Sequence, residues 1–317
     1  MREATARLTT EARDGRLNRA AIWTALGTIY VVWGSTYLAI RVMVETAPPL
    51  LAAGVRFVLA GAILLLALRI WPQAEPFAAS AREVATAVVV GALILFGGIG
   101  LLTAAEQRVP SGLAALIIAS VPLWIVIIRA LVRERPPWPT WVGTGIGFIG
   151  VALLVFGGRL AEGAPTTWLL VLLAAAASTA VGSFLSGRAR LPANALFSTA
   201  VEMLSAGLLM LVVGLAAGEG GDGLGDVSAK SLGALAYLVV VGSVLGYTAF
   251  VWLLRNASVS LVSTYAYVNP VVAVILGWAI LSEPLGPTVL IASLAILLAV
   301  AFVVTFERPS AWPPDAR

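Results

Sequence analysis

One run of the chain reads L-G-P-T-V-L-I-A-S-L-A-I-L-L-A-V-A-F-V-V-T-F (residues 285–306) and contains no charged side chain. An α-helix rises about 1.5 Å per residue, so about 20 apolar residues cross the ~30 Å hydrocarbon core of a bilayer. Similar runs recur along the chain, without the two-residue alternation of a barrel strand. The sequence predicts an all-α membrane protein with ten transmembrane helices, at 22–44, 50–70, 84–105, 110–131, 138–157, 167–187, 195–217, 231–253, 258–281 and 285–306.

The composition of the 317 residues excludes several classes of protein. Sixty per cent of the residues are hydrophobic and 11% are charged, against roughly 25% charged in soluble domains. So few charges do not cover the surface of a soluble, disordered or nucleic-acid-binding protein. There is no Cys and no His, which excludes a thiol nucleophile, an imidazole base and a Cys/His metal site. We therefore expect no metal, no cofactor and no nucleic-acid partner.

The basic residues predict the orientation in the membrane. If the N-terminus is cytoplasmic, fifteen Arg residues fall in inner segments and four Lys or Arg residues in outer ones. This excess follows the positive-inside rule. The sequence predicts a multi-pass integral membrane protein with both termini in the cytoplasm.

The chain also contains a duplication. Four pairs of polar or proline residues recur at offsets of 147, 146, 148 and 149, namely Arg41/Arg188, Arg56/Glu202, Pro122/Pro270 and Glu134/Glu283. Each copy holds five spans, and an odd number turns the second copy upside down, as in many secondary transporters. We expect an N-terminal tail at 1–21, a first repeat at 22–157, a linker at 158–166, a second repeat at 167–306 and a C-terminal tail at 307–317.

Several motifs carry a family resemblance that covers about residues 22–306. They are W-G-S-T-Y-L-A-I-R (Trp33–Arg41), P-P-L-L-A-A-G-V-R-F (Pro48–Phe57), P-S-G-L-A-A-L-I-I-A-S-V-P-L (Pro110–Leu123), N-P-V-V-A-V-I-L-G-W (Asn269–Trp278) and L-S-E-P-L (Leu281–Leu285). In this order they resemble the EamA family of the drug/metabolite transporter superfamily, and within it the YedA-like exporters. The resemblance implies a ten-helix carrier in a bacterial-type plasma or inner membrane. It also implies a central cavity and export of small metabolites or drugs.

Two ionisable residues stand well inside predicted spans, away from their ends: Arg56 and Glu202. Placing a charged side chain at the centre of a transmembrane helix costs about 2.5–3.5 kcal/mol on insertion scales. Such a residue is therefore a functional candidate by default. Counted from opposite membrane faces, the two lie roughly 10 Å apart along the membrane normal, so their interaction stays open. Each either supports its own half of the cavity or anchors its helix to neighbours by hydrogen bonds. Glu202 is the candidate carboxylate if export is coupled to protons.

Aromatic and hydroxyl side chains on several spans suit an organic substrate. Tyr30, Trp33 and Tyr37 form one stripe on the first span. The alternative is that these side chains pack the helices together. The cavity candidates are Trp33, Ser35, Thr36, Tyr37, Arg56, Trp124, Ser183, Glu202, Tyr247, Ser263, Tyr267 and Asn269. We also expect Pro122 and Pro270 to kink their helices, because proline cannot donate an amide hydrogen and clashes one turn back.

Glycines of the fifth span read G-T-G-I-G-F-I-G. The G-x-G-x-x-G match here lacks the strand that a dinucleotide site needs. Gly143 and Gly147 instead form a small-residue face for helix packing, either within the protein or in a homodimer.

The pattern as a whole favours a secondary transporter that moves a small molecule through the lipid bilayer by alternating access. An exporter of amino acids, amines or drugs fits the candidate residues. The alternatives are a non-transporting receptor or scaffold and an intramembrane enzyme, which would lack a His base and a Lys within a span. Substrate identity, coupling ion, direction and oligomeric state stay open.

Overall fold

The structure is a computed structural model that describes residues 2–70, 79–156, 164–221 and 225–306. Residues 2–70 and 79–156 form α1 (Arg2–Met43), α2 (Pro49–Ile70), α3 (Ala81–Gly91), the π-helix η1 (Ala92–Gly100), α4 (Leu101–Ala105), α5 (Ser111–Ile118), α6 (Val121–Leu131) and α7 (Trp138–Phe156). Residues 164–221 and 225–306 form α8 (Thr166–Ser186), α9 (Ala195–Ala216), α10 (Ala229–Tyr237), the π-helix η3 (Leu238–Leu245), α11 (Gly246–Asn256), α12 (Val259–Val262), α13 (Tyr265–Leu281) and α14 (Pro287–Phe306). The described residues are helical and contain no strand.

Nine helical segments of the described residues are long and apolar enough to cross a membrane. A shorter apolar helix, Tyr265–Leu281, lies within the predicted span 258–281. It is shorter because the chain turns at Ser263 and Thr264, between α12 and α13. At the N-terminus, α1 begins at Arg2, so the segment that we expected as a tail continues the first helix. Most of the expected linker, 158–163, and the tail 307–317 lie outside the described residues.

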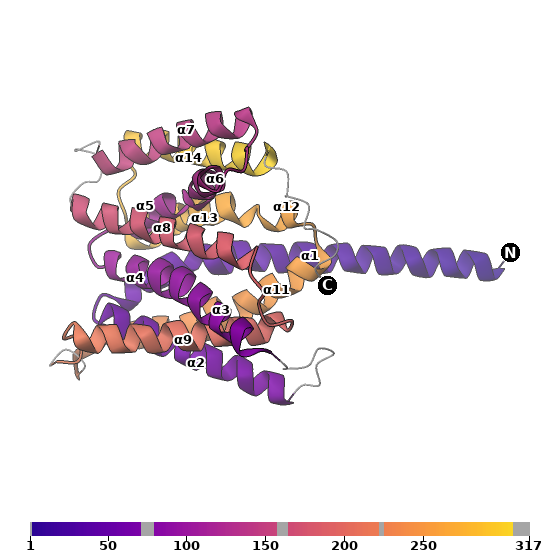
Figure 1. Cartoon of the computed structure of the whole chain (residues 1–317), viewed down its shortest axis with the longest axis horizontal. Helices are drawn as coiled ribbons and strands as arrows, with labels where there is room; N and C mark the ends of the chain where they lie inside the picture. Colours follow the sequence, from indigo (N-terminus) through magenta and orange to yellow (C-terminus); the bar gives the residue numbers. More distant parts are fainter. Residues whose placement is uncertain (1, 71–78, 157–163, 222–224, 307–317) are drawn as a thin grey trace.

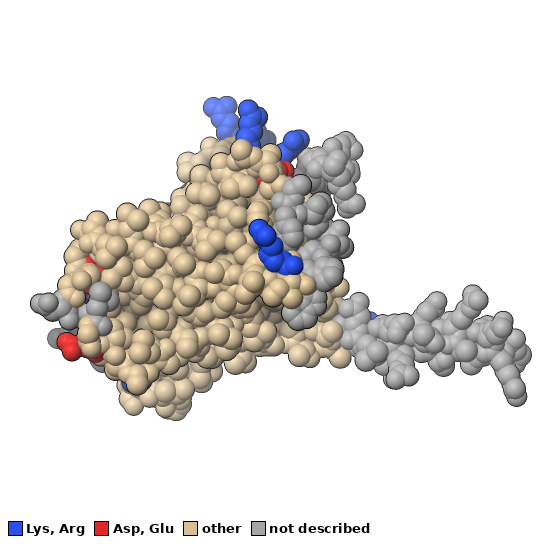
Figure 2. All heavy atoms as spheres, turned by 90° about the horizontal axis from the view of Figure 1, so that it is seen from below, with Lys and Arg blue, Asp and Glu red and all other residues tan. Residues whose placement is uncertain are grey.

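The helices pack side by side along a common direction (Figure 1). Helices α2 and α9 share the most extensive contact and lie at one edge, while α7 and α14 pack together at the opposite edge. Helix α1 runs between these edges and contacts α10, α11 and α13. Figure 2 shows a broad uncharged face with charged side chains near its margins. Outward-facing residues such as Ile149 and Val212 are more than half exposed, as lipid contact requires.

Small residues permit the close approach of helices. A Cβ atom on Gly207 would lie 2.8 Å from the backbone nitrogen of Val58 and 2.9 Å from the carbonyl oxygen of Gly54. On α7, a Cβ atom on Gly143 would lie 3.0 Å from Val303, and one on Gly147 would lie 2.4 Å from Leu123. The Gly143/Gly147 face is therefore covered by α14 and α6 within the chain, and a homodimer would need another face.

The two prolines take different positions in their helices. Pro122 stands in the first turn of α6, and the break between α5 and α6 lies directly before it. There the Ser120 hydroxyl donates to the carbonyl oxygen of Ile117 at 2.6 Å. Pro270 stands inside the continuous helix α13, and the nearest break lies at Thr264, more than one turn earlier. The Thr264 hydroxyl contacts both the Leu261 carbonyl and the Tyr30 hydroxyl, so side-chain bonding accompanies this second break.

Candidate functional site

Four aromatic rings meet where α1, α11 and α13 come together, and we name them the Trp33 cluster: Trp33, Tyr247, Phe250 and Tyr265. The ring centroid of Trp33 lies 5.3 Å from Tyr247, 5.1 Å from Phe250 and 5.3 Å from Tyr265. These are the separations at which edge and face of aromatic rings attract. A Cβ atom on Gly246 would lie 2.5 Å from the Trp33 indole nitrogen. Only glycine at position 246 leaves room for this ring.

The π-helix η3 joins the Trp33 cluster to the buried charge Arg56. The indole Nε1 of Trp33 donates to the carbonyl oxygen of Gly242 at 3.2 Å. Nε of Arg56 donates to Ser243 Oγ at 3.0 Å, and Arg56 is 3% exposed. Successive residues of η3 therefore contact an aromatic and a cationic side chain. A π-helix has a wider turn than an α-helix and is common at functional sites.

Other predicted residues surround this point. The hydroxyls of Ser35 and Tyr237 lie 2.7 Å apart. The Thr36 hydroxyl donates to the carbonyl oxygen of Trp33 at 2.6 Å. Asn269 is 7% exposed, and its Oδ1 has no hydrogen-bond partner in the part of the chain that the structure describes. Its backbone oxygen lies close to Gly34 of α1, so the backbone of Asn269 packs against the same helix that carries Trp33. Buried groups of this kind call for an explanation in function.

The structure places other predicted residues elsewhere. Trp124 packs edge-on against Phe148 of α7 at 5.1 Å, and Ser183 stands near the end of α8. Half-buried Tyr37 and Tyr267 pack against the largest apolar core. Ser263 lies in the turn between α12 and α13.

Glu202 on α9 accepts a hydrogen bond from Ser198 Oγ at 3.0 Å. In the part of the chain that the structure describes, no ion pair joins Glu202 to Arg56. Helices α2 and α9 therefore pack closely along their length, but Arg56 of α2 and Glu202 of α9 do not pair.

Glu106 is a buried acidic residue that the sequence reasoning missed. It directly follows α4 and is 0% exposed, and among the described residues neither oxygen of its carboxyl group has a hydrogen-bond partner. Its backbone carbonyl accepts a hydrogen bond from Arg41. The predicted span ends at residue 105, as the helical segment Ala81–Ala105 does, so this prediction assigns Glu106 to a loop and does not indicate its burial. The position of Glu106 directly after an unbroken apolar run was the one sign in the sequence that its side chain could be buried.

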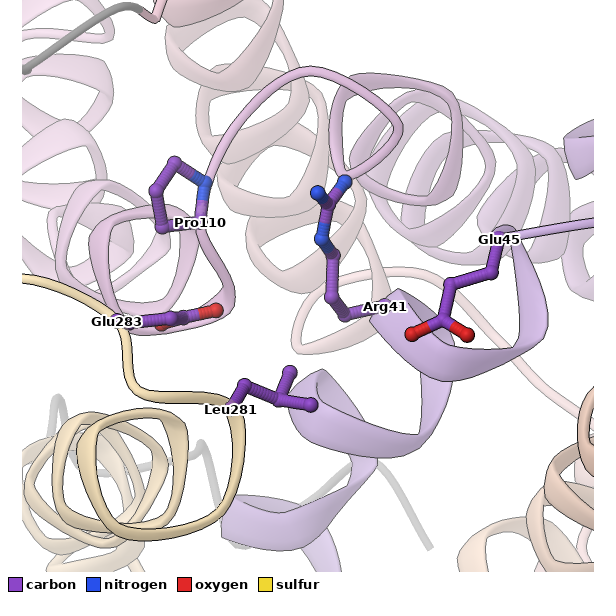
Figure 3. A pocket seen from close by; sticks show the side chains of 5 residues that line it. All are labelled: Arg41, Glu45, Pro110, Leu281 and Glu283. Carbon is purple, nitrogen blue, oxygen red and sulfur yellow. The ribbon is translucent and has the colours of Figure 1, made fainter.

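A pocket of about 180 Å³ lies at the end of the bundle where Arg41 contacts Glu106, and we name this end the Arg41 end. It is lined by Arg41, Glu45, Pro110, Leu281 and Glu283 (Figure 3). Figure 3 shows the Arg41 side chain between Glu45 on one side and Pro110 with Glu283 on the other. Lys230 Nζ contacts Glu45 Oε2 at 2.9 Å. The pocket therefore brings together charged groups from segments that are far apart in the sequence.

A second set of charges surrounds Glu134, in the turn between α6 and α7. Nε of Arg129 lies 2.6 Å from Glu134 Oε2, and Arg188 contacts the other oxygen. The hydrogen bond from Arg129, followed by that from Arg188, lowers the pKa of Glu134 below its ordinary value of 4.5. We name this region the Arg188 end. Among the described residues, no group of three or more acidic side chains could hold a metal ion.

Comparison with known proteins gives the family. The family described as EamA-like transporter family matches residues 19–156 and 166–305. The protein named "Uncharacterized inner membrane transporter YedA" of Escherichia coli (strain K12) is 39% identical over 280 residues, which cover 88% of this chain and 89% of that one. The "Probable terminal-alkyne amino-acid exporter" of Streptantibioticus cattleyicolor is 26% identical over 289 residues, covering 91% and 93%.

A solved crystal structure has a similar fold. It matches with a TM-score of 0.62 at 19% sequence identity and covers 92% of this chain and all of that one. At this identity the likeness concerns the fold alone. The two family matches and the 39% identity to YedA carry the assignment: the chain belongs to the EamA-like transporter family and is a membrane transporter rather than an enzyme.

Proposed function

We propose that this transporter exports small organic molecules, such as amino acids, amines or drugs, by alternating access between two inverted five-helix repeats. The repeats occupy 22–157 and 167–306. With ten spans, α12 and α13 together supply the ninth. The protein then lies in a bacterial-type inner membrane, in keeping with the name of its relative YedA.

The family match and the helices support the duplication. The family matches the chain twice, once in each proposed repeat. The two π-helices begin at Ala92 and Leu238, 146 positions apart, which is the register of the sequence repeat. A rare helix type at equivalent places is expected if both halves share one ancestral design.

The orientation rests on charge. Fifteen basic residues fall in segments on the side of the N-terminus and four in segments on the other side. We therefore place both termini in the cytoplasm. The Arg188 end is then cytoplasmic and the Arg41 end extracytoplasmic.

The observation that carries the substrate proposal is the junction of Trp33 and Arg56 at η3. Trp33 and Arg56 are bound to adjacent residues, Gly242 and Ser243, so an aromatic face and a guanidinium act on one site. The rings offer contact area and cation–π attraction for an amine. Arg56 offers a carboxylate a charge-assisted hydrogen bond. A zwitterion uses both, which accords with the amino-acid exporter among the relatives.

Export can be tested with cells that express or lack the protein, challenged with amino-acid analogues, aliphatic amines and aromatic cationic dyes. Expression should raise resistance to one of these classes, and the purified protein in liposomes should give saturable flux of that compound. Arg56→Ala and Trp33→Ala should each lower flux strongly at equal protein level. Trp138→Ala, at a side chain that is 76% exposed, is the matched control.

Binding of these compounds without saturable flux would favour a receptor or scaffold and contradict the export proposal. Glu202→Gln belongs in the same series. Normal flux in both Arg56→Ala and Glu202→Gln would remove the two intramembrane charges from the proposed mechanism.

A further inference from the structure

Glu134 and Glu283 occupy equivalent places in the sequence repeat. Glu134 precedes α7, Glu283 precedes α14, and 149 positions separate them. The arginines that follow the same register are Arg188, just after α8, and Arg41, in the last turn of α1. Each half of the chain therefore supplies one carboxylate and one arginine, but the two ends of the bundle use them differently.

At the Arg188 end, the carboxylate of Glu134 is paired with arginine. Arg188 contacts Oε1, and Arg129 holds Oε2 at 2.6 Å. The guanidinium of Arg188 also lies over the ring of Phe184, 3.6 Å from its centroid. These contacts tie the end of α8 to the turn between α6 and α7.

At the Arg41 end, the equivalent carboxylate is held by backbone amides instead. Glu283 accepts from the Ser111 amide at 2.7 Å, from the Ser111 hydroxyl at 2.8 Å and from the Gly112 amide at 2.9 Å. Arg41 lines the same pocket as Glu283 but donates to the backbone carbonyl of Glu106 (Figure 3). No ion pair joins Arg41 to Glu283 in the described part of the chain.

Both arrangements rest on interactions of modest size. Glu134 and Arg188 are 30% and 39% exposed, and ion pairs at such exposure are weak. A carboxylate at the start of a helix is favoured by an interaction of similar, modest size. A substrate that binds one conformation more tightly than the other shifts the balance between two such arrangements.

We propose that Arg188–Glu134 and Arg41–Glu283 are alternating latches at opposite ends of the carrier. The Arg188–Glu134 latch is closed in this structure. When the carrier turns over, this latch opens, Glu283 leaves the start of α5, and Arg41 pairs with it. The inference rests on the proposed inverted repeats. The four residues act as positioning residues that set the balance of the two conformations and do not bind substrate.

The test uses single-cysteine variants, for which the natural absence of cysteine gives a clean background. Leu281→Cys reports from the pocket at the Arg41 end, and Ser186→Cys, at a half-buried position two residues before Arg188, reports from the Arg188 end. The full chain in lipid nanodiscs is labelled with a water-soluble maleimide, and the ratio of the two labelling rates measures the conformational balance.

Arg188→Gln should open the closed latch, which raises labelling at position 186 and lowers it at 281. Arg41→Gln should shift the ratio in the opposite sense. Each shift should be about threefold, as expected for breaking one partly exposed ion pair. Arg108→Gln, at an exposed cation of the Arg41 end, should leave the ratio unchanged. The conservative variant Arg188→Lys keeps a cation beside Glu134 and should hold the ratio near that of the wild type, which separates loss of the latch from misfolding.

Shifts of the same sign for Arg188→Gln and Arg41→Gln, or an Arg41→Gln ratio equal to that of Arg108→Gln, would overturn the latches. The labelling experiment needs no substrate, so its result does not depend on the result of the export assay. A protein without measurable flux but with opposite shifts would refute the proposed export and support the latches.

Discussion

The indole nitrogen of Trp33 in α1 donates to the carbonyl oxygen of Gly242, 209 positions further along the chain, at 3.2 Å. This bond fixes the rotation of α1 relative to η3 and therefore decides which aromatic rings surround Trp33. Because the neighbouring Ser243 accepts from Arg56, the same segment of η3 also sets the position of the buried cation. Four predictions about the bundle and its site follow.

Gly246→Ala should disturb the Trp33 cluster. The added methyl group would lie 2.5 Å from the Trp33 indole nitrogen, so the ring must move. Overpacking of this kind costs about 1–3 kcal/mol, and if this cost falls on substrate binding, apparent affinity drops by about fivefold to 150-fold. Flux of the exported compound against its concentration measures the effect. Gly233→Ala, with nothing within 4 Å of the new methyl group, is the control, and equal behaviour of the two variants would contradict the role of Gly246.

Gly207→Ala should destabilise the whole protein, because its Cβ atom would meet the backbone of Val58 at 2.8 Å in the most extensive helix contact. Backbone cannot rotate away, so we expect a loss of about 1–3 kcal/mol in the free energy of unfolding. Gly145→Ala places its methyl group in open space and should stabilise its helix by about 0.5–1 kcal/mol. Thermal unfolding in detergent should move the two melting temperatures in opposite directions. A normal melting temperature for Gly207→Ala would contradict the close packing.

Glu106→Met should raise stability, because a buried carboxyl group without a hydrogen-bond partner costs about 1–3 kcal/mol. Glu219→Met is the matched contrast. The Glu219 carboxylate accepts from the amides of Leu50 and Leu51 at 3.0 and 2.9 Å, so its loss should cost about 0.5–2 kcal/mol as a lost helix cap. Unfolding of the two variants side by side gives the comparison. If Glu106→Met unfolds as readily as Glu219→Met, Glu106 has a stabilising partner in the membrane-bound protein.

Acidification should weaken the contribution of Glu134 to stability. The hydrogen bond from Arg129, with that from Arg188, lowers the pKa of Glu134 from its ordinary 4.5. A carboxyl group with a lowered folded-state pKa contributes its full stabilisation above the unfolded value, and loses it as the pH falls through the folded value. The melting temperature of the wild type should therefore exceed that of Glu134→Gln at about pH 6, and the gap should close towards about pH 3. A gap that stays constant over this range would show that Glu134 acts without its charge.

The helices could be predicted from sequence more completely than the site. Apolar run length located the spans, and the membrane character needed no tertiary information. The turn at Ser263 and Thr264 escaped prediction, because the stretch 258–281 carries no charged residue and has neither glycine nor proline at that point, and because the Thr264 contact with Tyr30 joins residues 234 positions apart. In the site, residue type singled out Trp33, Tyr247 and Arg56. It did not indicate that Trp124 would pack on Phe148 or that Glu106 would be buried.

The sequence by itself determined that this protein lies in a membrane, roughly where its helices run, and which residue types within them are unusual. Transfer of a helix into lipid depends on the sum of its own side chains, so local composition suffices. Only the tertiary structure decided that Trp33 contacts Gly242, that Glu202 contacts Ser198 rather than Arg56, and that Glu283 contacts Ser111 while Glu134 contacts Arg188. Those pairings depend on how helices distant in the sequence rotate and pack against one another, which no single apolar run encodes.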